Sequence, residues 1–209
     1  KLFCDLLVIL FVVHSFGTKN LKKTYTMKRF TFFVLLLSVA MLGFAQKKTT
    51  PPPPDMPIDD KSQLITYQDV VQVDATAKVL YDRALKWAKS FYHNPSEVIK
   101  SQDATNYVLK MRSSVRIYSH LKDGSKITKN VVYYNFTLQC REGRYRYTIT
   151  DFNEKAAAAS PIEKWMNPED TKWDPECYIN LQEVDEQIRA LIDSLIDGML
   201  PEVEQEEEW

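Results

Sequence analysis

The residues most suited to chemistry in this sequence are basic side chains between positions 106 and 146. This stretch holds nine basic residues and only two acidic ones, Asp123 and Glu142. Many of the basic residues alternate with apolar ones, which is typical of a β-strand with one face buried and the other in water. Cations interleaved with an aromatic ring form a surface suited to an anionic partner. On this surface we expect Lys110, Arg112, Arg116, Tyr133, Arg141, Arg144 and Arg146, with Asn135 and Gln139 beside them.

A merely solvated face is the alternative, because surface charge commonly serves to keep a domain soluble. Charge is unevenly divided along the chain. Residues 46–173 carry 20 Lys and Arg against 15 Asp and Glu, whereas residues 174–209 carry Arg189 against 12 acidic residues. This division is consistent with an outside partner, and equally with two parts of one domain that complement each other. The acidic residues 202–208 are therefore one candidate partner for the basic face.

Residues that could support catalysis or metal binding form no recognisable arrangement in the sequence. His14, His93 and His120 lack the spacing of a metal site, and no serine lies in a nucleophile elbow. Only three glycines follow residue 45, too few for a phosphate-binding loop. We therefore expect no cofactor or metal, and a non-catalytic binding or interaction domain of unknown specificity. The alternative is an exported, hydrolase-like enzyme whose site has no known motif.

Residues 27–45 have the pattern of a secretory signal peptide. Lys28 and Arg29 precede an apolar run at 30–42, and Gly43 and Ala45 are the small residues before a cut at Gln46. We interpret residues 1–26 as upstream translation or a misassigned start. Two membrane segments, at residues 6–13 and 30–42, are the alternative, but both apolar runs are shorter than the ~20 residues that a spanning helix needs. No cysteine stands directly after the run to carry a lipid anchor, so we expect an exported, periplasmic or extracellular protein without a stable membrane anchor.

The two cysteines beyond the signal peptide, Cys140 and Cys177, would be able to pair in an oxidising compartment. Cys140 lies on the apolar phase of a predicted strand, where a small buried hydrophobic side chain is the alternative. A bridge requires a specific geometry that the sequence does not supply. Both interpretations of Cys140 therefore remain open at this point.

The remainder of the chain predicts one domain with a linker and a tail. Residues 46–62, with a polyproline run at 51–54, are expected to be an extended linker. Residues 201–209 are expected to be an acidic, disordered tail. Between them, residues 63–200 begin with a strand at 64–73 and a helix at 76–94. The helix should be capped by Asp74 or Thr76 and should face the core with Leu80, Ala84, Trp87 and Phe91.

Four further strands are expected at 96–101, 107–117, 132–140 and 145–150, with glycine turns near Gly124 and Gly143. Residues 153–176 form a long connection whose Trp165 and Trp173 should pack on the domain. A second helix should start at an Asn180–Glu183 capping box. Its apolar stripe is Leu181, Val184, Ile188, Leu191, Ile192, Leu195 and Met199. The order β-α-β-β-β-β-α predicts a two-layer α+β domain, an antiparallel sheet with both helices on one face.

Three segments resemble a family of secreted bacterial domains of unknown function with a TBP-like fold. They are the valine-rich residues 71–73, the helix residues 76–87 ending in Trp87, and residues 98–103 ending in Asp103. The resemblance covers about residues 64–152 and implies the same β-α-β-β-β-β-α order, with no catalytic residues to carry over. It departs at Ala75-Thr76, where the family usually has Gly-Ser, and at Tyr107, where a Gly-Ile pair is usual; both positions affect turns.

The fold name and the basic sheet together raise nucleic-acid binding as a further function. That idea rests on analogy of fold alone, which does not establish function, and the predicted signal peptide opposes it. We therefore expect no nucleic-acid partner. The expected partner is an unidentified protein or an anionic component of the cell envelope.

Overall fold

The computed structural model describes residues 51–121, 123–156, 158 and 160–201. The chain divides into two units, residues 1–49 and 50–209, and the first lies outside the described residues. The predicted signal peptide, the segment before it, and the acidic tail from residue 202 onward therefore also lie outside them. Among the described residues, no helix is both long and apolar enough to cross a membrane.

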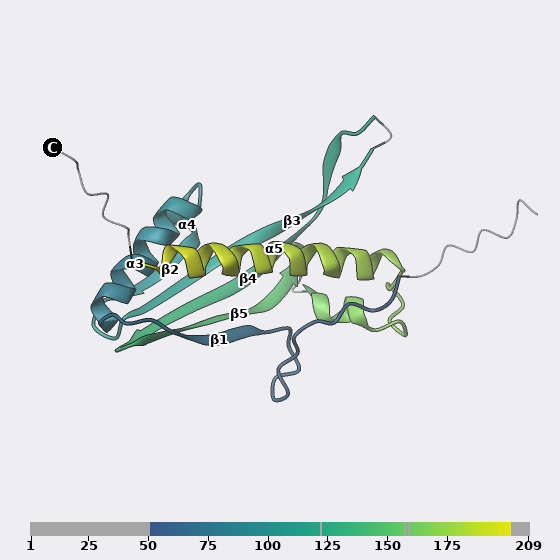
Figure 1. Cartoon of the computed structure of the whole chain (residues 1–209). Coiled ribbons are helices and arrows are strands. Elements are labelled where there is room, and N and C mark those ends of the chain that lie inside the picture. The colour runs from purple at the N-terminus through teal and green to yellow at the C-terminus, as the bar shows by residue number, and fades with distance from the viewer. Residues whose placement is uncertain (1–50, 122, 157, 159, 202–209) are drawn as a thin grey trace, which may run out of the picture. The chain divides into compact units, whose positions relative to one another are not determined.

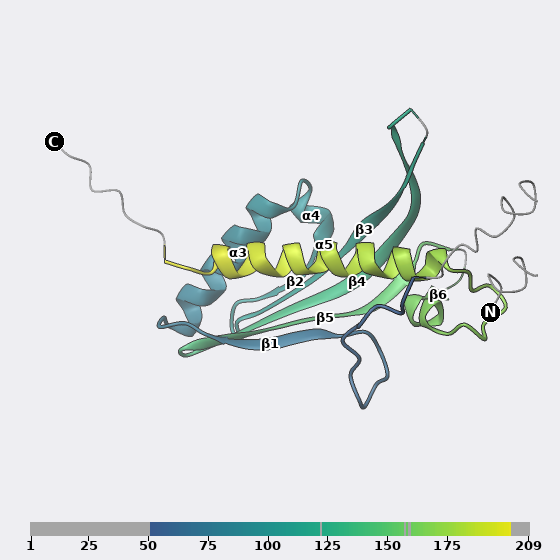
Figure 2. The same cartoon turned by 45° about the vertical axis from the view of Figure 1, so that its right-hand side comes forward.

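The described part of the second unit is an antiparallel sheet with helices on one face (Figures 1 and 2). The sheet has the strand order β1-β5-β4-β3-β2, and a short β6 pairs with β5. The predicted two-layer α+β fold is thus confirmed, with α4, β6 and η1 as additions. In chain order the elements are β1 (Tyr67–Gln72), α3 (Ala77–Phe91), α4 (Pro95–Val98), β2 (Ile99–Asp103), β3 (Val108–His120), β4 (Lys126–Arg141), β5 (Arg144–Glu154), β6 (Ser160–Pro161), the 3-10 helix η1 (Ile162–Met166) and α5 (Glu176–Gly198).

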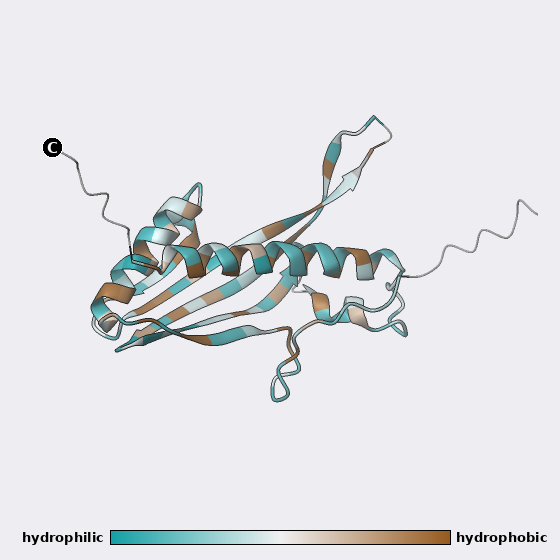
Figure 3. Ribbon diagram, in the orientation of Figure 1, coloured by the Kyte–Doolittle hydropathy of each residue, from teal (hydrophilic) through white to brown (hydrophobic). Residues whose placement is uncertain are grey.

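The core lies between the sheet and the two long helices, where α3 packs on β4 and α5 on β3. Figure 3 shows the apolar residues recurring along the strands and along α5. The buried Trp87 of α3 contacts both α5 and the sheet. Its Nε1 donates a hydrogen bond to Ser194 Oγ of α5 at 3.1 Å, and its ring packs edge-on against Phe136 of β4 at 5.9 Å between centroids. The predicted stripe of α5 is also buried throughout.

Helix α3 begins as one of the two predicted caps requires, because Thr76 Oγ1 accepts a hydrogen bond from the Val79 N–H at 3.3 Å. The prediction for Phe91 was wrong. Phe91 is the last residue of α3 and is 43% exposed, stacked on Trp87 at 5.2 Å between ring centroids. Tyr92, just past the helix, takes the buried position instead.

Two predicted element boundaries also need correction. Residues 95–98 form the short helix α4 rather than a strand, because Pro95 suits a first helical turn, where its missing N–H costs nothing. Helix α5 begins at Glu176, four residues before the predicted Asn180–Glu183 box. Asp174 Oδ1 accepts from the Glu176 N–H at 2.7 Å. Asn180 is therefore not a cap but a buried residue in the second turn.

The linker prediction fails for its C-terminal part. Met56 is buried in the core, Ile58 pairs with Ile65, and the Thr66 N–H donates to the Pro57 carbonyl at 2.8 Å. Residues 56–58 therefore contact the domain, whereas residues 60–62 are exposed. Extended character is typical of prolines, but Met56 supplies an apolar side chain that the core accommodates.

Candidate anion-binding face

The face of the sheet opposite α3 and α5 has no helix over it (Figure 1). Residues paired across antiparallel strands share a face, so the register identifies the residues that point outward. Arg146 of β5 lies between Val70 of β1 and Gln139 of β4, and the next outward pair on these strands is Arg144 with Arg141. Outward residues two apart on one strand are about 7 Å apart. The register therefore gathers three arginines at the end of the β4–β5 hairpin.

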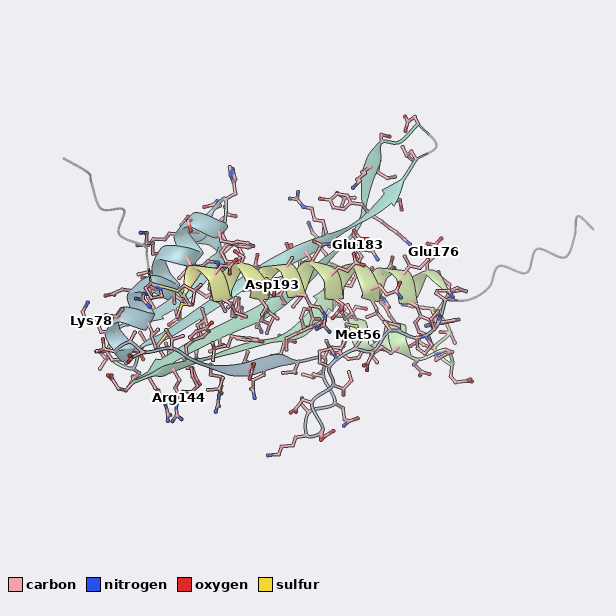
Figure 4. The ribbon with its side chains drawn as sticks, in the orientation of Figure 1. Met56, Lys78, Arg144, Glu176, Glu183 and Asp193 are labelled. Atoms are coloured by element: carbon pink, nitrogen blue, oxygen red, sulfur yellow. The ribbon has the colours of Figure 1, made fainter. Side chains whose placement is uncertain are left out.

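These residues line a pocket of about 150 Å³ on the open face, formed by Val70, Gln139, Arg141, Arg144 and Arg146. We call it the arginine pocket. Figure 4 shows Arg144 at this end of the sheet, with its side chain projecting away from α5. Arg141 and Arg144 are directly opposite each other, and like charges in that position destabilise a sheet. An arrangement that costs stability without a ligand is suited to an anion that would neutralise it.

None of the three arginine side chains has an ion pair or hydrogen bond with another described residue. The nearest acid in sequence, Glu142 of the hairpin turn, faces elsewhere: its Oε2 accepts from the Ala77 N–H at the start of α3 at 3.3 Å. The turn is fixed by Gly143, whose φ of +71° suits glycine and whose N–H donates to the Ala75 carbonyl at 3.0 Å. The hairpin therefore holds its carboxylate on α3 and leaves its guanidiniums free.

The other predicted residues of the basic face lie outside the arginine pocket. Arg112 lies over the ring of Tyr133, with 5.6 Å from its Cζ to the ring centroid, so these two form a cation–π pair. Lys110 is exposed opposite Thr137. Arg116 is exposed opposite Val131, farther along β3. The structure thus brings together Arg141, Arg144 and Arg146 and pairs Arg112 with Tyr133, while Lys110 and Arg116 line neither the arginine pocket nor the cation–π pair.

Comparison with known proteins agrees with this architecture. Residues 67–155 match the family model described as a domain of unknown function (DUF4468) with TBP-like fold. This segment resembles that family, over less than half of the chain. No curated protein matches the chain.

Two solved structures resemble the chain. A TBP-like protein from Parabacteroides distasonis ATCC 8503 is 17% identical with a TM-score of 0.51, and the match covers 68% of this chain and 96% of that one. A DUF4468 family protein from Bacteroides ovatus ATCC 8483 is 12% identical with a TM-score of 0.56, and the match covers 71% of this chain and 94% of that one. At such low identity the likeness shows the fold alone.

The two cysteines of the described residues do not form a disulfide. Cys140 and Cys177 are free and buried. Cys140 lies near the β4–β5 hairpin and Cys177 in the first turn of α5, toward the other end of the sheet (Figure 1). The alternative of a small buried hydrophobic residue describes Cys140, and burial raises the pKa of its thiol to about 12.

Sequence reasoning missed Val70 as part of the arginine pocket. The alternation that places Tyr67 and Val71 toward the core puts Val70 on the outward face, so its position could have been predicted. A single apolar residue on an outward face does not by itself indicate a binding site. Val70 is 37% exposed and forms the apolar wall of the pocket. Among the described residues, no group of three or more His, Cys, Asp and Glu could hold a metal ion.

Proposed function

We propose that this protein is an exported, non-catalytic binding module whose open sheet face takes an anionic partner through the arginine pocket. The observation that carries the proposal is the convergence of Arg141, Arg144 and Arg146 around one pocket without an acidic partner among the described residues. Guanidinium groups are planar and present paired donors that match the oxygens of carboxylate and phosphate groups. The chemistry of the partner is therefore a carboxylate or phosphate group of a protein or of an envelope component.

The shape of the face supports a binding surface over a catalytic cleft. The arginine pocket is small and shallow, about 150 Å³, whereas sites that enclose small molecules are typically about 300–1,000 Å³. Its lining has cations, one amide and one apolar side chain, without a nucleophile or a base. The cation–π pair of Arg112 and Tyr133 continues the basic surface along the same face. An extended anionic chain could therefore contact both features.

The test measures binding of the purified exported chain to a hexaglutamate peptide and to vesicles of phosphatidylglycerol, at low and high salt. A variant with Arg141, Arg144 and Arg146 replaced by Ser should lose binding at low salt. Wild-type binding should weaken steeply as salt is raised, because exposed charges are screened within about 10 Å at 0.1 M ionic strength. Phosphatidylcholine vesicles are the uncharged comparison.

The matched control replaces three exposed lysines elsewhere, Lys61, Lys89 and Lys155, by Ser, which removes the same net charge. This control should bind as wild type does if the arginine pocket is the site. Equal loss in both triple variants would show a general charge effect and contradict the proposal. The proposal would also be contradicted if the wild-type protein bound neither of the two anionic probes at low salt.

A further inference from the structure

A second cavity lies toward the other end of the sheet, beneath the long connection between β5 and α5. Its volume is about 360 Å³. Among its lining residues are Lys129, Lys164, Trp165, Asp170, Trp173 and Asn180. Figure 4 shows Glu176, at the start of α5 beside this cavity, far along the sheet from Arg144. The cavity is thus separate from the arginine pocket, and its size falls within the range of small-molecule sites, about 300–1,000 Å³.

Asn180 is the residue of this cavity that the fold does not explain. It is 7% exposed and lies on the stripe of α5 that is otherwise apolar, next to Leu181 and one turn after Cys177. Its side-chain amide has no hydrogen bond with any described residue. Its amide atoms are not among the fully enclosed side-chain atoms that lack a partner, so they open onto the cavity. A ligand in the cavity would supply the missing donors and acceptors.

Two tryptophans on the connection are held in place around this cavity. Trp173 donates its Nε1–H to the Trp165 carbonyl at 2.9 Å, and its ring contacts Tyr178 of α5 edge-on at 5.1 Å between centroids. Both indoles are half-buried and line the cavity. Trp165 belongs to the 3-10 helix η1, which follows β6 in this connection. Here the connection supplies a fixed aromatic wall.

The charges around the cavity balance. Three lysines, Lys129, Lys164 and Lys172, are matched by Glu154, Asp170 and Asp174. Lys129 is paired with Glu176 at the rim, and Asp170 and Asp174 accept backbone hydrogen bonds from Lys172 and Glu176. The cavity therefore has donors and acceptors of both kinds but no excess of either charge, in contrast to the arginine pocket.

We propose that this cavity binds a neutral, hydroxyl-rich ligand of the size of a sugar ring. Such a ring has apolar C–H faces that pack on indole surfaces, and hydroxyls that both donate and accept hydrogen bonds. The amide of Asn180 likewise offers an acceptor oxygen and two donor hydrogens. An anion would find no net positive charge here, and a purely apolar ligand would leave Asn180 unpaired. Carboxylates and lysines at the rim can accept from and donate to the outer hydroxyls.

The first arm of the test uses the exported chain labelled with ¹⁵N, and follows the indole N–H signals of Trp165 and Trp173. The probes are glucose, galactose, mannose and N-acetylglucosamine, with inorganic phosphate and the zwitterionic dipeptide Ala-Ala as charged comparisons. At least one sugar should shift both indole signals in a saturable manner. The proposal is overturned if no sugar shifts them, or if phosphate or the dipeptide does so as strongly.

The second arm replaces Asn180 by Leu, with Gln182→Leu on the exposed side of the same helix as the matched control. Asn180→Leu should weaken sugar binding by about tenfold or more, the effect of losing one or two well-made hydrogen bonds. It should also keep or raise the melting temperature, because it replaces an unpaired buried amide by an apolar side chain. Gln182→Leu should leave binding unchanged. Retained sugar binding in folded Asn180→Leu would overturn the proposal, whatever the fate of the arginine pocket.

Discussion

Gly198 of α5 lies against the indole of Trp87 so closely that a Cβ atom at position 198 would stand 2.5 Å from Cδ1 of Trp87. Atoms at that distance overlap, so one side would have to move. Trp87 has little room to do so, because its Nε1 is bonded to Ser194 and its ring is in contact with Phe136 and Tyr92. Gly198 is thus required for close packing of α5 on α3.

Replacing Gly198 by Ala should therefore destabilise the domain by about 1–3 kcal/mol, the usual effect of overpacking. Trp87→Ala alone should cost about 3–5 kcal/mol through loss of a buried aromatic side chain. In the Trp87→Ala background the effect of Gly198→Ala should become smaller, because the contacts at 2.5 Å and 2.9 Å with the indole ring are gone, while the Cβ of residue 87 still lies 3.1 Å from the added Cβ. Urea unfolding of all four proteins measures this coupling, and an additive result would contradict it.

The same two residues show what the sequence could and could not predict. The spacing of Leu80, Ala84 and Trp87 was enough to place Trp87 in the core, because helical periodicity specifies which face is buried. The contact of Gly198 with Trp87 depends on how α5 crosses α3, which helical periodicity does not determine. The prediction that Asn180 caps α5 was wrong for a related reason. A capping pattern is local, and the true start of the helix, at Asp174-Pro175, precedes it.

The basic face shows the same division between local and tertiary information. Alternation along β3, β4 and β5 correctly placed the seven predicted residues outward or at the surface. The grouping of Arg141, Arg144 and Arg146 with Val70 depends on the pairing of β5 with β1 at one edge and with β4 at the other. Pairing between β1 and β5 joins residues far apart in sequence, so it could not be read from any one segment.

A further prediction concerns alkaline pH. Burial raises the pKa of the Cys140 thiol from 9.0 to about 12, and burial also raises the pKa of its cross-strand partner Tyr145 to about 12. A group whose pKa is higher in the folded state than in the unfolded state stabilises the fold at a pH below its unfolded pKa. This stabilisation is lost as the pH rises through its folded pKa. The free energy of unfolding should therefore fall between pH 9 and 12.

Cys140→Val removes one of these protons while keeping a buried apolar side chain. Above pH 9 its free energy of unfolding should fall less steeply than that of wild type, by about 1.4 kcal/mol per pH unit for each proton removed. Urea unfolding at several pH values between 8 and 11 gives both slopes. Identical slopes would show that the Cys140 thiol ionises equally in the folded and unfolded states.

The proposed export gives a prediction about the mature chain. Signal peptidase reads small residues three and one before the cut, which are Gly43 and Ala45 here. The exported protein should therefore begin at Gln46, and an intact-mass measurement on protein from the envelope fraction determines this. A Gly43→Leu/Ala45→Leu variant should accumulate uncut. A mature mass that still includes residues 30–42 would instead favour a membrane anchor.

The last prediction concerns the acidic residues after Pro201, which lie outside the described residues. Five of them are glutamates: Glu202, Glu204, Glu206, Glu207 and Glu208. Helix α5 ends beside α3, where the Met199 carbonyl accepts from Arg83 Nη1 at 3.1 Å, and the β4–β5 hairpin lies at this same end of the sheet (Figures 1 and 2). Eight residues can span up to about 26–29 Å, and a path around the end of the sheet would lead to the arginine pocket on the opposite face.

A tethered segment competes with an outside ligand at an effective concentration of about millimolar. Truncation after Pro201 should therefore strengthen binding of hexaglutamate at low salt by several-fold, because it removes the competitor. The gain should vanish at high salt, where both interactions are screened, and it should be absent when Arg141, Arg144 and Arg146 are Ser. Equal binding of hexaglutamate with and without residues 202–209 would contradict this prediction. It would show that these glutamates are only solvated, and that the anionic partner comes from another molecule.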